Sequence, residues 1–130
     1  MIALDTKILL RLILNDEPSL CERATRLVSV HCSEADPGFI PVSVIQEVFF
    51  VLLRVYNDSK AEVAGVFRDI LNTTEFVVQL NDEVARAVSD FEQGAGFEDA
   101  LIEHLAKSEG CPTTYTLDEK AARLPTFTLV

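Results

Sequence analysis

The segment FIPVSVIQEVFFVLLRVY, residues 39–56, decides the fold of this chain. Residues 39–41 predict a minimal strand, and residues 42–56 predict a helix that is apolar on nearly every side. A helix of that kind is buried over most of its surface. Glu47 is the one carboxylate in it, and a lone acid on an apolar helix requires a reason. A strand that leads directly into a buried helix is typical of an α/β domain.

The rest of the chain repeats this alternation of short strands and longer helices. Turn and cap residues separate the elements, as at residues 15–18 and 94–96. Strands are expected at residues 2–4, 39–41, 76–78, 113–117 and 127–130. Helices are expected at residues 5–14, 18–31, 42–56, 58–71, 81–91 and 97–108, with a helical turn at 119–124. The alternation predicts an α/β fold with a mainly parallel sheet, in one domain that spans residues 1–130.

Composition and charge argue against a disordered chain and against a non-specific nucleic-acid binder. The chain has 130 residues, of which 48% are hydrophobic, and a formal charge of −10 at pH 7. Its mean hydropathy of +0.22 indicates a chain that buries a core and is not disordered. The acidity argues against broad, non-specific binding of nucleic acid, although bound metal ions would weaken that argument.

Neither secretion nor membrane insertion is expected. No basic region precedes an apolar run at the N-terminus, as it would in a signal peptide. The longest apolar stretch, residues 42–56, is too short to span a bilayer. Three cysteines give no even disulfide framework, so the sequence predicts a reduced, cytoplasmic protein.

Four carboxylates in apolar settings are the candidate functional residues: Asp5, Glu47, Asp99 and Asp118. Asp5 and Asp118 each follow a predicted strand, whereas Glu47 and Asp99 lie near the starts of helices. Sites in open α/β sheets form beyond the carboxyl ends of the strands, so we expect the four to converge. A divalent cation such as Mg²⁺ or Mn²⁺ would supply the counter-charge. This constellation points to metal-assisted hydrolysis of phosphoesters.

Each carboxylate also has a purely structural explanation. Asp5 and Asp118 are suitable caps for the helices that follow them, and Asp99 would complement a helix dipole. Glu47 is the hardest of the four to explain in this way. One shared site explains all four carboxylates, whereas the structural explanation requires a separate reason for each of them.

The chain resembles the PIN-domain family, specifically the VapC-like toxin ribonucleases of bacterial toxin–antitoxin pairs. The matching segments are residues 4–6, 40–47, 96–102 and 116–120, in the family's order and spacing. The resemblance implies a three-layer α/β/α sandwich. It also implies that the four carboxylates form an acidic metal site, with Thr6 and Thr116 as supporting hydroxyls.

One position departs from the family pattern. An Asn commonly follows the Asp-Thr pair, and this chain has Lys7 there. Asn can orient a neighbouring carboxylate by hydrogen bonding, whereas Lys offers only a cation. Lys7 would therefore either take part of the metal's charge role or contact substrate phosphate.

The resemblance implies an endoribonuclease that uses Mg²⁺ or Mn²⁺ to hydrolyse RNA phosphodiester bonds. Asp5 and Asp99 are the preferred direct ligands, and Glu47 and Asp118 would bind through water or orient the nucleophile. Four cations that follow the site acids are candidate phosphate contacts, with solvated helix faces as the alternative: Lys7, Arg11, Lys120 and Arg123. The expected protein partners are an antitoxin and a second copy of the chain, because the predicted helices carry surplus apolar positions.

Three other classes of protein are alternatives to this one. An interaction module with weak or no nuclease activity would bind an antitoxin-like partner, and Lys7 is consistent with it. A phosphoacceptor receiver domain is also small and acidic, but it explains neither Glu47 nor Asp99. A haloacid-dehalogenase site would require an Asp at position 7.

Overall fold

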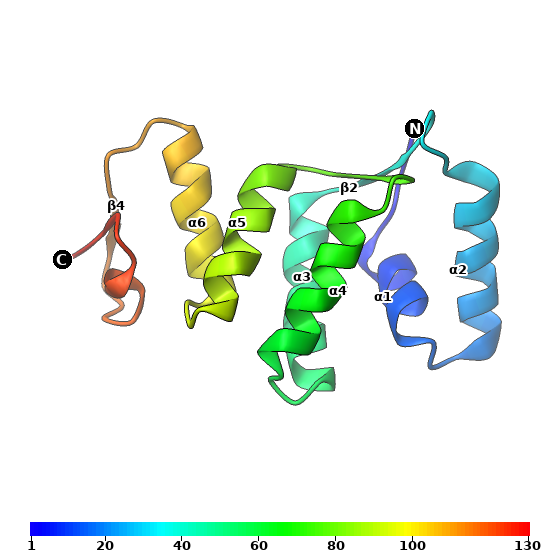
Figure 1. Ribbon diagram of the computed structural model, residues 1–130, viewed down its shortest axis with the longest axis horizontal. Helices are drawn as coiled ribbons and strands as arrows, with labels where there is room; N and C mark the ends of the chain where they lie inside the picture. The colour runs from blue at the N-terminus through cyan, green and yellow to red at the C-terminus, as the bar shows by residue number, and fades with distance from the viewer. The chain divides into compact units, whose positions relative to one another are not determined.

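The computed structural model describes all 130 residues, and its strands and helices alternate along the chain as expected (Figure 1). The chain divides into two compact units, Met1–Asn81 (unit 1) and Asp82–Val130 (unit 2). Unit 1 contains β1 (Ile2–Ala3), α1 (Thr6–Leu14), α2 (Pro18–His31), β2 (Gly38–Ile40), α3 (Val42–Val55), α4 (Lys60–Asn72) and β3 (Phe76–Val78). The remaining elements are α5 (Asn81–Glu92), α6 (Phe97–Ser108), β4 (Thr114–Thr116), the 3₁₀ helix η1 (Ala121–Arg123) and β5 (Phe127–Leu129).

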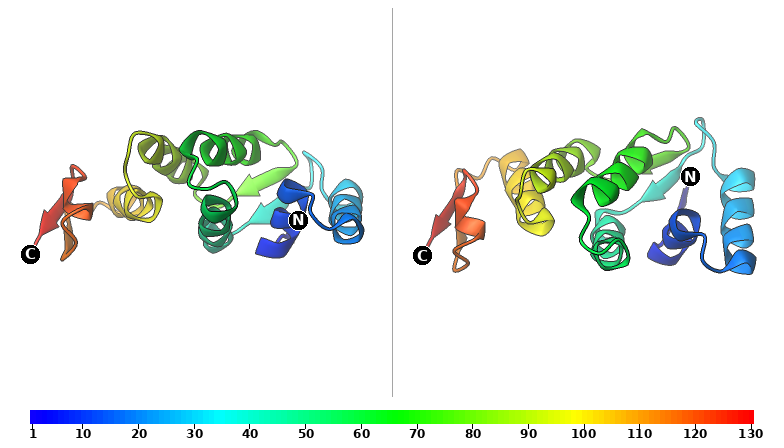
Figure 2. Two further views of the ribbon diagram at one scale, coloured as in Figure 1. Left: turned by 90° about the horizontal axis from the view of Figure 1, so that it is seen from below. Right: turned by 60° about the horizontal axis from the view of Figure 1, so that its bottom comes forward.

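Unit 1 is built on a three-stranded parallel sheet in the order β1-β2-β3. Ile2 pairs with Gly38, and Gly38 pairs in turn with Phe76, so that β2 is the central strand. Both views in Figure 2 show α4 on one side of β2 and β3, and α1 and α3 on the other. Helices therefore cover both faces of this sheet, as a parallel sheet requires.

Helix α3 has the buried character that its sequence predicts. Five of its side chains are buried: Val44, Ile45, Val48, Phe49 and Leu52. Each contributes roughly 1.5–3 kcal/mol through removal of apolar surface from water. The ring of Phe49 also packs on that of Phe67 in α4, with centroids 4.9 Å apart.

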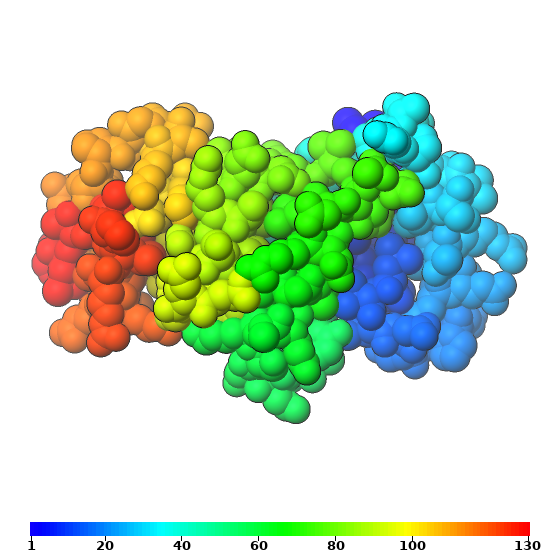
Figure 3. All heavy atoms as spheres, viewed as in Figure 1, coloured from blue at the N-terminus to red at the C-terminus, as the bar shows by residue number.

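Helices α1 and α2 pack side by side, as the continuous dark and light blue surface in Figure 3 shows. Asn15, in the left-handed conformation at φ 50°, ends α1, and Pro18 opens α2. Asn tolerates that conformation better than most residues, and Pro suits the first helical turn. The break expected at residues 15–18 is thus confirmed.

Unit 2 combines two helices with a two-stranded parallel sheet. Thr114 of β4 pairs with Phe127 of β5, and the connection between the strands carries η1. Apolar side chains of α5 and α6 are buried, among them Val84, Val88 and Leu101. The two helices expected at residues 81–91 and 97–108 are confirmed as α5 and α6.

The α/β class and the parallel strands expected from the sequence are confirmed. Every strand pair is parallel, and the strands form one sheet of three and one of two. This element content is consistent with a three-layer α/β/α fold. None of the helices combines the length and the apolar character needed to cross a membrane.

Candidate functional site

Asp5 and Glu47 are linked in unit 1 through Thr6. Asp5 follows β1 and caps α1, where its Oδ1 accepts a hydrogen bond from the Ile8 N–H at 3.2 Å. Thr6, the first residue of α1, donates its hydroxyl proton to Oε2 of Glu47 at 2.8 Å. Because Asp5 and Thr6 are consecutive, this bond holds the start of α1 against the face of α3 that carries Glu47.

The chemistry of these two carboxylates fits a hard divalent cation. Both side chains are exposed, and neither forms an ion pair with Lys or Arg. One oxygen of each is engaged by a neutral donor, which leaves the other oxygen free to act as a ligand. Carboxylate oxygens are the ligands that Mg²⁺ and Mn²⁺ prefer. Asp5 and Glu47 could therefore hold such an ion.

Asp99 lies in a pocket of about 480 Å³ within unit 2. It belongs to the first turn of α6, where negative charge is favoured by the helix dipole. Its side chain is half-buried and approaches Gly96, at which an added Cβ would lie 3.3 Å from Oδ2 of Asp99. The close approach explains why a residue without a side chain precedes this helix.

Asp118 has a capping role at the end of β4. Its Oδ1 accepts hydrogen bonds from the N–H groups of Lys120 and Ala121, at 2.8 and 3.3 Å. Its own N–H donates to the hydroxyl of Thr116 at 3.0 Å. The structural explanation given for Asp5 is therefore correct, since it caps α1, and Asp118 likewise accepts backbone N–H bonds at the start of η1, although the N-cap position itself is Lys120. Each still has a second carboxylate oxygen that no hydrogen bond occupies.

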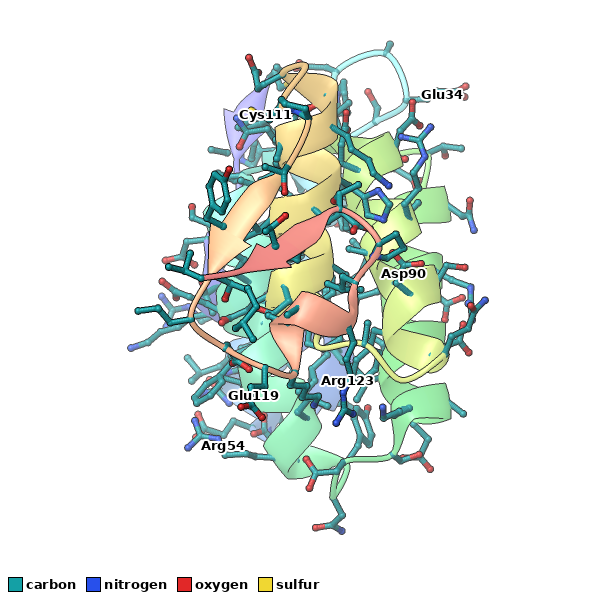
Figure 4. All side chains as sticks on the ribbon, turned by 90° about the vertical axis from the view of Figure 1, so that its left-hand side faces the viewer. Glu34, Arg54, Asp90, Cys111, Glu119 and Arg123 are labelled. Atoms are coloured by element: carbon teal, nitrogen blue, oxygen red, sulfur yellow. The ribbon has the colours of Figure 1, made fainter.

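The candidate phosphate contacts occupy two places. Lys120 and Arg123 line the pocket that contains Asp99, and Figure 4 shows Arg123 on η1. Lys7 and Arg11 instead line a groove of about 430 Å³ between α1 and α2. Arg11 is already engaged there, because Asp16 accepts a hydrogen bond from it at 2.7 Å. That bond raises the pKa of Arg11 and lowers the pKa of Asp16.

Three residues that the sequence did not single out gather in the same pocket: Asp90, Glu103 and His104. Their potential ligand atoms lie within 4.8 Å of one another, a spacing that a divalent ion can bridge. In the structure Oδ2 of Asp90 lies 2.6 Å from Nε2 of His104, and Glu103 is bonded to Thr126. Figure 4 shows Asp90 on α5.

These residues carry no clear signal in the sequence. Glu103 and Lys107 have the spacing of an ordinary surface ion pair on a helix, and His104 has no partner at zinc-ligand spacing. The one available indication is that Glu103 follows Asp99 by four residues, which places both on one face of α6.

The four predicted acids are divided between the compact units. Unit 1 carries Asp5 and Glu47, and unit 2 carries Asp99 and Asp118. Thr6 ties the first pair together, whereas Asp118 is not among the residues that line the pocket of Asp99. The convergence of all four stays a prediction.

Comparison with known proteins identifies the family. No curated protein and no solved structure matches the chain. The family model described as the PIN domain does match, over residues 2–126, which is nearly the whole chain and takes in the segments of all four acids. The chain therefore belongs to the PIN-domain family.

Proposed function

We propose that this chain is a metal-dependent endoribonuclease that hydrolyses RNA phosphodiester bonds. The match to the PIN domain over residues 2–126 carries the proposal, because PIN domains are generally nucleases that use divalent metals. We further propose that the chain is the toxin of a toxin–antitoxin pair. Residues 1–130 would then form a single PIN-like domain, in keeping with a family match that runs through both compact units.

The proposed metal is Mg²⁺ or Mn²⁺, with Asp5, Glu47, Asp99 and Asp118 as its acidic residues. Asp5 and Asp99 are the proposed direct ligands, and Glu47 and Asp118 bind the metal through water or orient the nucleophile. A bound divalent ion supplies an activated water molecule and offsets the charge of the phosphate. Thr6 supports this role by fixing one oxygen of Glu47, and Thr116 does so by fixing the backbone at Asp118.

Lys120 and Arg123 are proposed phosphate contacts, because both line the pocket that contains Asp99. Cations in this pocket would attract the anionic RNA backbone. Such local positive charge is needed because the formal charge of the whole chain is −10. Lys7 and Arg11 line a different groove, and they are proposed as further contacts along the RNA.

The proposed protein partners are an antitoxin and a second copy of the chain, and the proposed location is the cytoplasm. Helices α2 and α3 present large exposed apolar side chains, among them Val30 and Phe50. These side chains are the positions at which such a partner could cover apolar surface.

The decisive experiment is an RNA cleavage assay with Mg²⁺, with Mn²⁺ and with EDTA. The wild type is compared with Asp5→Asn, a change that keeps a side-chain cap on α1 and removes the negative charge. Asp99→Asn is compared with Glu98→Gln, which neutralises the exposed carboxylate next to it on the same helix. We expect metal-dependent cleavage by the wild type and by Glu98→Gln, and its loss in the two Asp variants.

Two outcomes would contradict the proposal. Cleavage that survives EDTA would reject the dependence on metal. A folded wild type that cleaves no RNA with either ion would reject the nuclease, and would favour the interaction module that binds an antitoxin-like partner.

A further inference from the structure

Glu103 is the only charged residue of the chain that is buried. It lies in α6 and is 2% exposed, whereas every other residue buried to this degree is apolar. Taking a carboxylate out of water is costly unless hydrogen bonds replace those of the solvent. The partners of Glu103 therefore indicate what the residue does.

Thr126 supplies those hydrogen bonds. Oε2 of Glu103 accepts from the Thr126 hydroxyl at 2.8 Å and from the Thr126 N–H at 3.1 Å. Burial alone would raise the pKa of Glu103, but the two bonds from Thr126, together with the nearby charges of Lys107 and His104, lower it. The carboxylate is therefore ionised at neutral pH, and it accepts charge-assisted hydrogen bonds, which are stronger than neutral ones.

Thr126 is held from its other side as well. Its carbonyl oxygen accepts from the Thr114 N–H at 3.0 Å and from the Thr113 hydroxyl at 2.9 Å. Thr126 thus connects α6 to the beginning of β4, and the pairing of β4 with β5 continues from this point. These bonds fix the end of the connection formed by residues 117–125 that leads into β5.

The connection carries three residues of the proposed site: Asp118, Lys120 and Arg123. Helix α6 carries a fourth, Asp99, one turn before Glu103 and on the same face. Asp99, Glu103, Lys120 and Arg123 all line the same pocket. A bond between Glu103 and Thr126 therefore sets how the connection lies against the part of α6 that presents Asp99.

We propose that Glu103 is a positioning residue, which holds residues 117–125 through Thr126 so that Lys120 and Arg123 face the pocket of Asp99. Its role in RNA cleavage rests on the function proposed above. Glu103 does not contact the phosphate itself, since its Oε2 is occupied by Thr126 and its Oε1 lies 3.6 Å from Nζ of Lys107.

Two substitutions of Thr126 separate positioning from general stability. Thr126→Val keeps the shape and the N–H donor and removes the hydroxyl, whereas Thr126→Ser restores the hydroxyl. Val88→Ala provides the stability control, because Val88 is buried in α5 and does not line the pocket. All variants are compared at the same interval below their own melting temperatures.

The first measurement is the rate of cleavage of an RNA oligonucleotide at saturating and at limiting concentrations of that RNA. We expect Thr126→Val to lower kcat/KM by about tenfold or more, since misplacement of a positioned group by 1 Å can cost about a hundredfold. Thr126→Ser and Val88→Ala should retain nearly all of the wild-type value. Wild-type activity in Thr126→Val, or an equal loss in Val88→Ala, would overturn the proposal.

The second measurement is backbone amide hydrogen exchange, which requires no RNA and no metal. Thr126→Val should increase exchange within residues 117–125 and leave α5 unchanged, and Thr126→Ser should restore the protection. If the wild type cleaves no RNA, the function proposed above fails. The exchange measurement then still tests whether Glu103 holds residues 117–125 in place through Thr126. Unchanged exchange in residues 117–125 would reject this positioning role.

Discussion

The hydroxyl of Thr6 donates a hydrogen bond of 2.8 Å to Oε2 of Glu47, a residue 41 positions further along the chain. It joins the first turn of α1 to the second turn of α3, and α1 and α3 pack together in unit 1. The bond leaves Oε1 of Glu47 free and limits the directions in which that oxygen can point. In the proposed metal site, Thr6 would orient Glu47 and so contribute to metal affinity without touching the metal.

Removal of that hydroxyl should weaken metal binding. Thr6→Val preserves the shape of the side chain, and we expect it to reduce Mn²⁺ affinity by about tenfold, as for other residues that orient metal ligands. Thr6→Ser should behave like the wild type. Melting temperature measured against Mn²⁺ concentration gives the affinity through the stabilisation that binding confers. Equal shifts for Thr6→Val and the wild type would show that the bond has only a structural role.

Gly38 should not tolerate a side chain. An added Cβ would lie 2.8 Å from Cδ1 of Leu4 and 2.9 Å from Sγ of Cys32, in the centre of the unit 1 sheet. We expect Gly38→Ala to lower the free energy of unfolding by about 1–3 kcal/mol, as overpacking of a core does. Urea denaturation provides the measurement.

Gly65 is the matched control for this substitution. It lies within α4, and an added Cβ would meet nothing within 4 Å. Gly65→Ala should therefore raise the free energy of unfolding by roughly 0.5–1 kcal/mol, because Ala favours the helix over Gly. A destabilised Gly65→Ala together with a stable Gly38→Ala would show that the packing around β2 is described wrongly.

The bond between Glu103 and Thr126 should make stability depend on pH in the acidic range. The pKa of Glu103 is lowered in the folded chain from an ordinary value of 4.5, so the folded state favours the ionised form. This contribution is complete above about pH 4.5 and is lost as the pH falls through the lowered pKa. The difference in melting temperature between the wild type and Glu103→Gln should thus be constant near neutrality and shrink in acid.

Thr126→Val is the control for the acid-range measurement. It removes the hydroxyl bond, which contributes most to the lowering of the pKa. The dependence on pH should be weaker in this variant than in the wild type. The melting temperatures of the wild type and Glu103→Gln should approach each other as the pH falls. A difference between them that grows in acid would contradict an ionised, hydrogen-bonded Glu103.

The three cysteines should differ in reactivity toward alkylating reagents. Cys21 and Cys32 are buried, Cys111 is exposed, and none forms a disulfide. Burial also raises the pKa of the Cys32 thiol, which lowers the amount of reactive thiolate. Mass spectrometry after brief treatment with iodoacetamide should show one modified thiol in the native wild type and none in native Cys111→Ser. Rapid modification of Cys32 before unfolding would contradict its burial.

Local sequence patterns were sufficient to predict the elements of this fold. The helix expected at residues 42–56 is found as Val42–Val55, and that expected at 97–108 is found as Phe97–Ser108. Periodicity and punctuation by Pro, Gly and Asn determine such elements locally. The N-cap of α4 is Ser59, while Asp58 takes a left-handed conformation at φ 60°. Asp and Ser are both favoured at the N-cap, so capping propensity alone does not tell which of Asp58 and Ser59 occupies that position.

The contacts that organise the candidate site could not be predicted in the same way. The bond from Thr6 to Glu47 and the bonds from Thr126 to Glu103 join residues far apart in the chain. No spacing rule relates such positions, because tertiary packing brings them together. Glu103 cannot be identified from the sequence for a related reason: its spacing from Lys107 suggests an exposed ion pair, although the residue is buried.

The parallel pairing of every strand has a consequence for the speed of folding. Ile2 meets a partner 36 residues away, whereas Thr114 meets one only 13 residues away. For a flexible chain, closing the longer loop costs about 0.9 kcal/mol more in entropy. We therefore expect the pairing of β4 with β5 to form early in refolding, and the three-stranded sheet of unit 1 to form in the slower, rate-limiting phase.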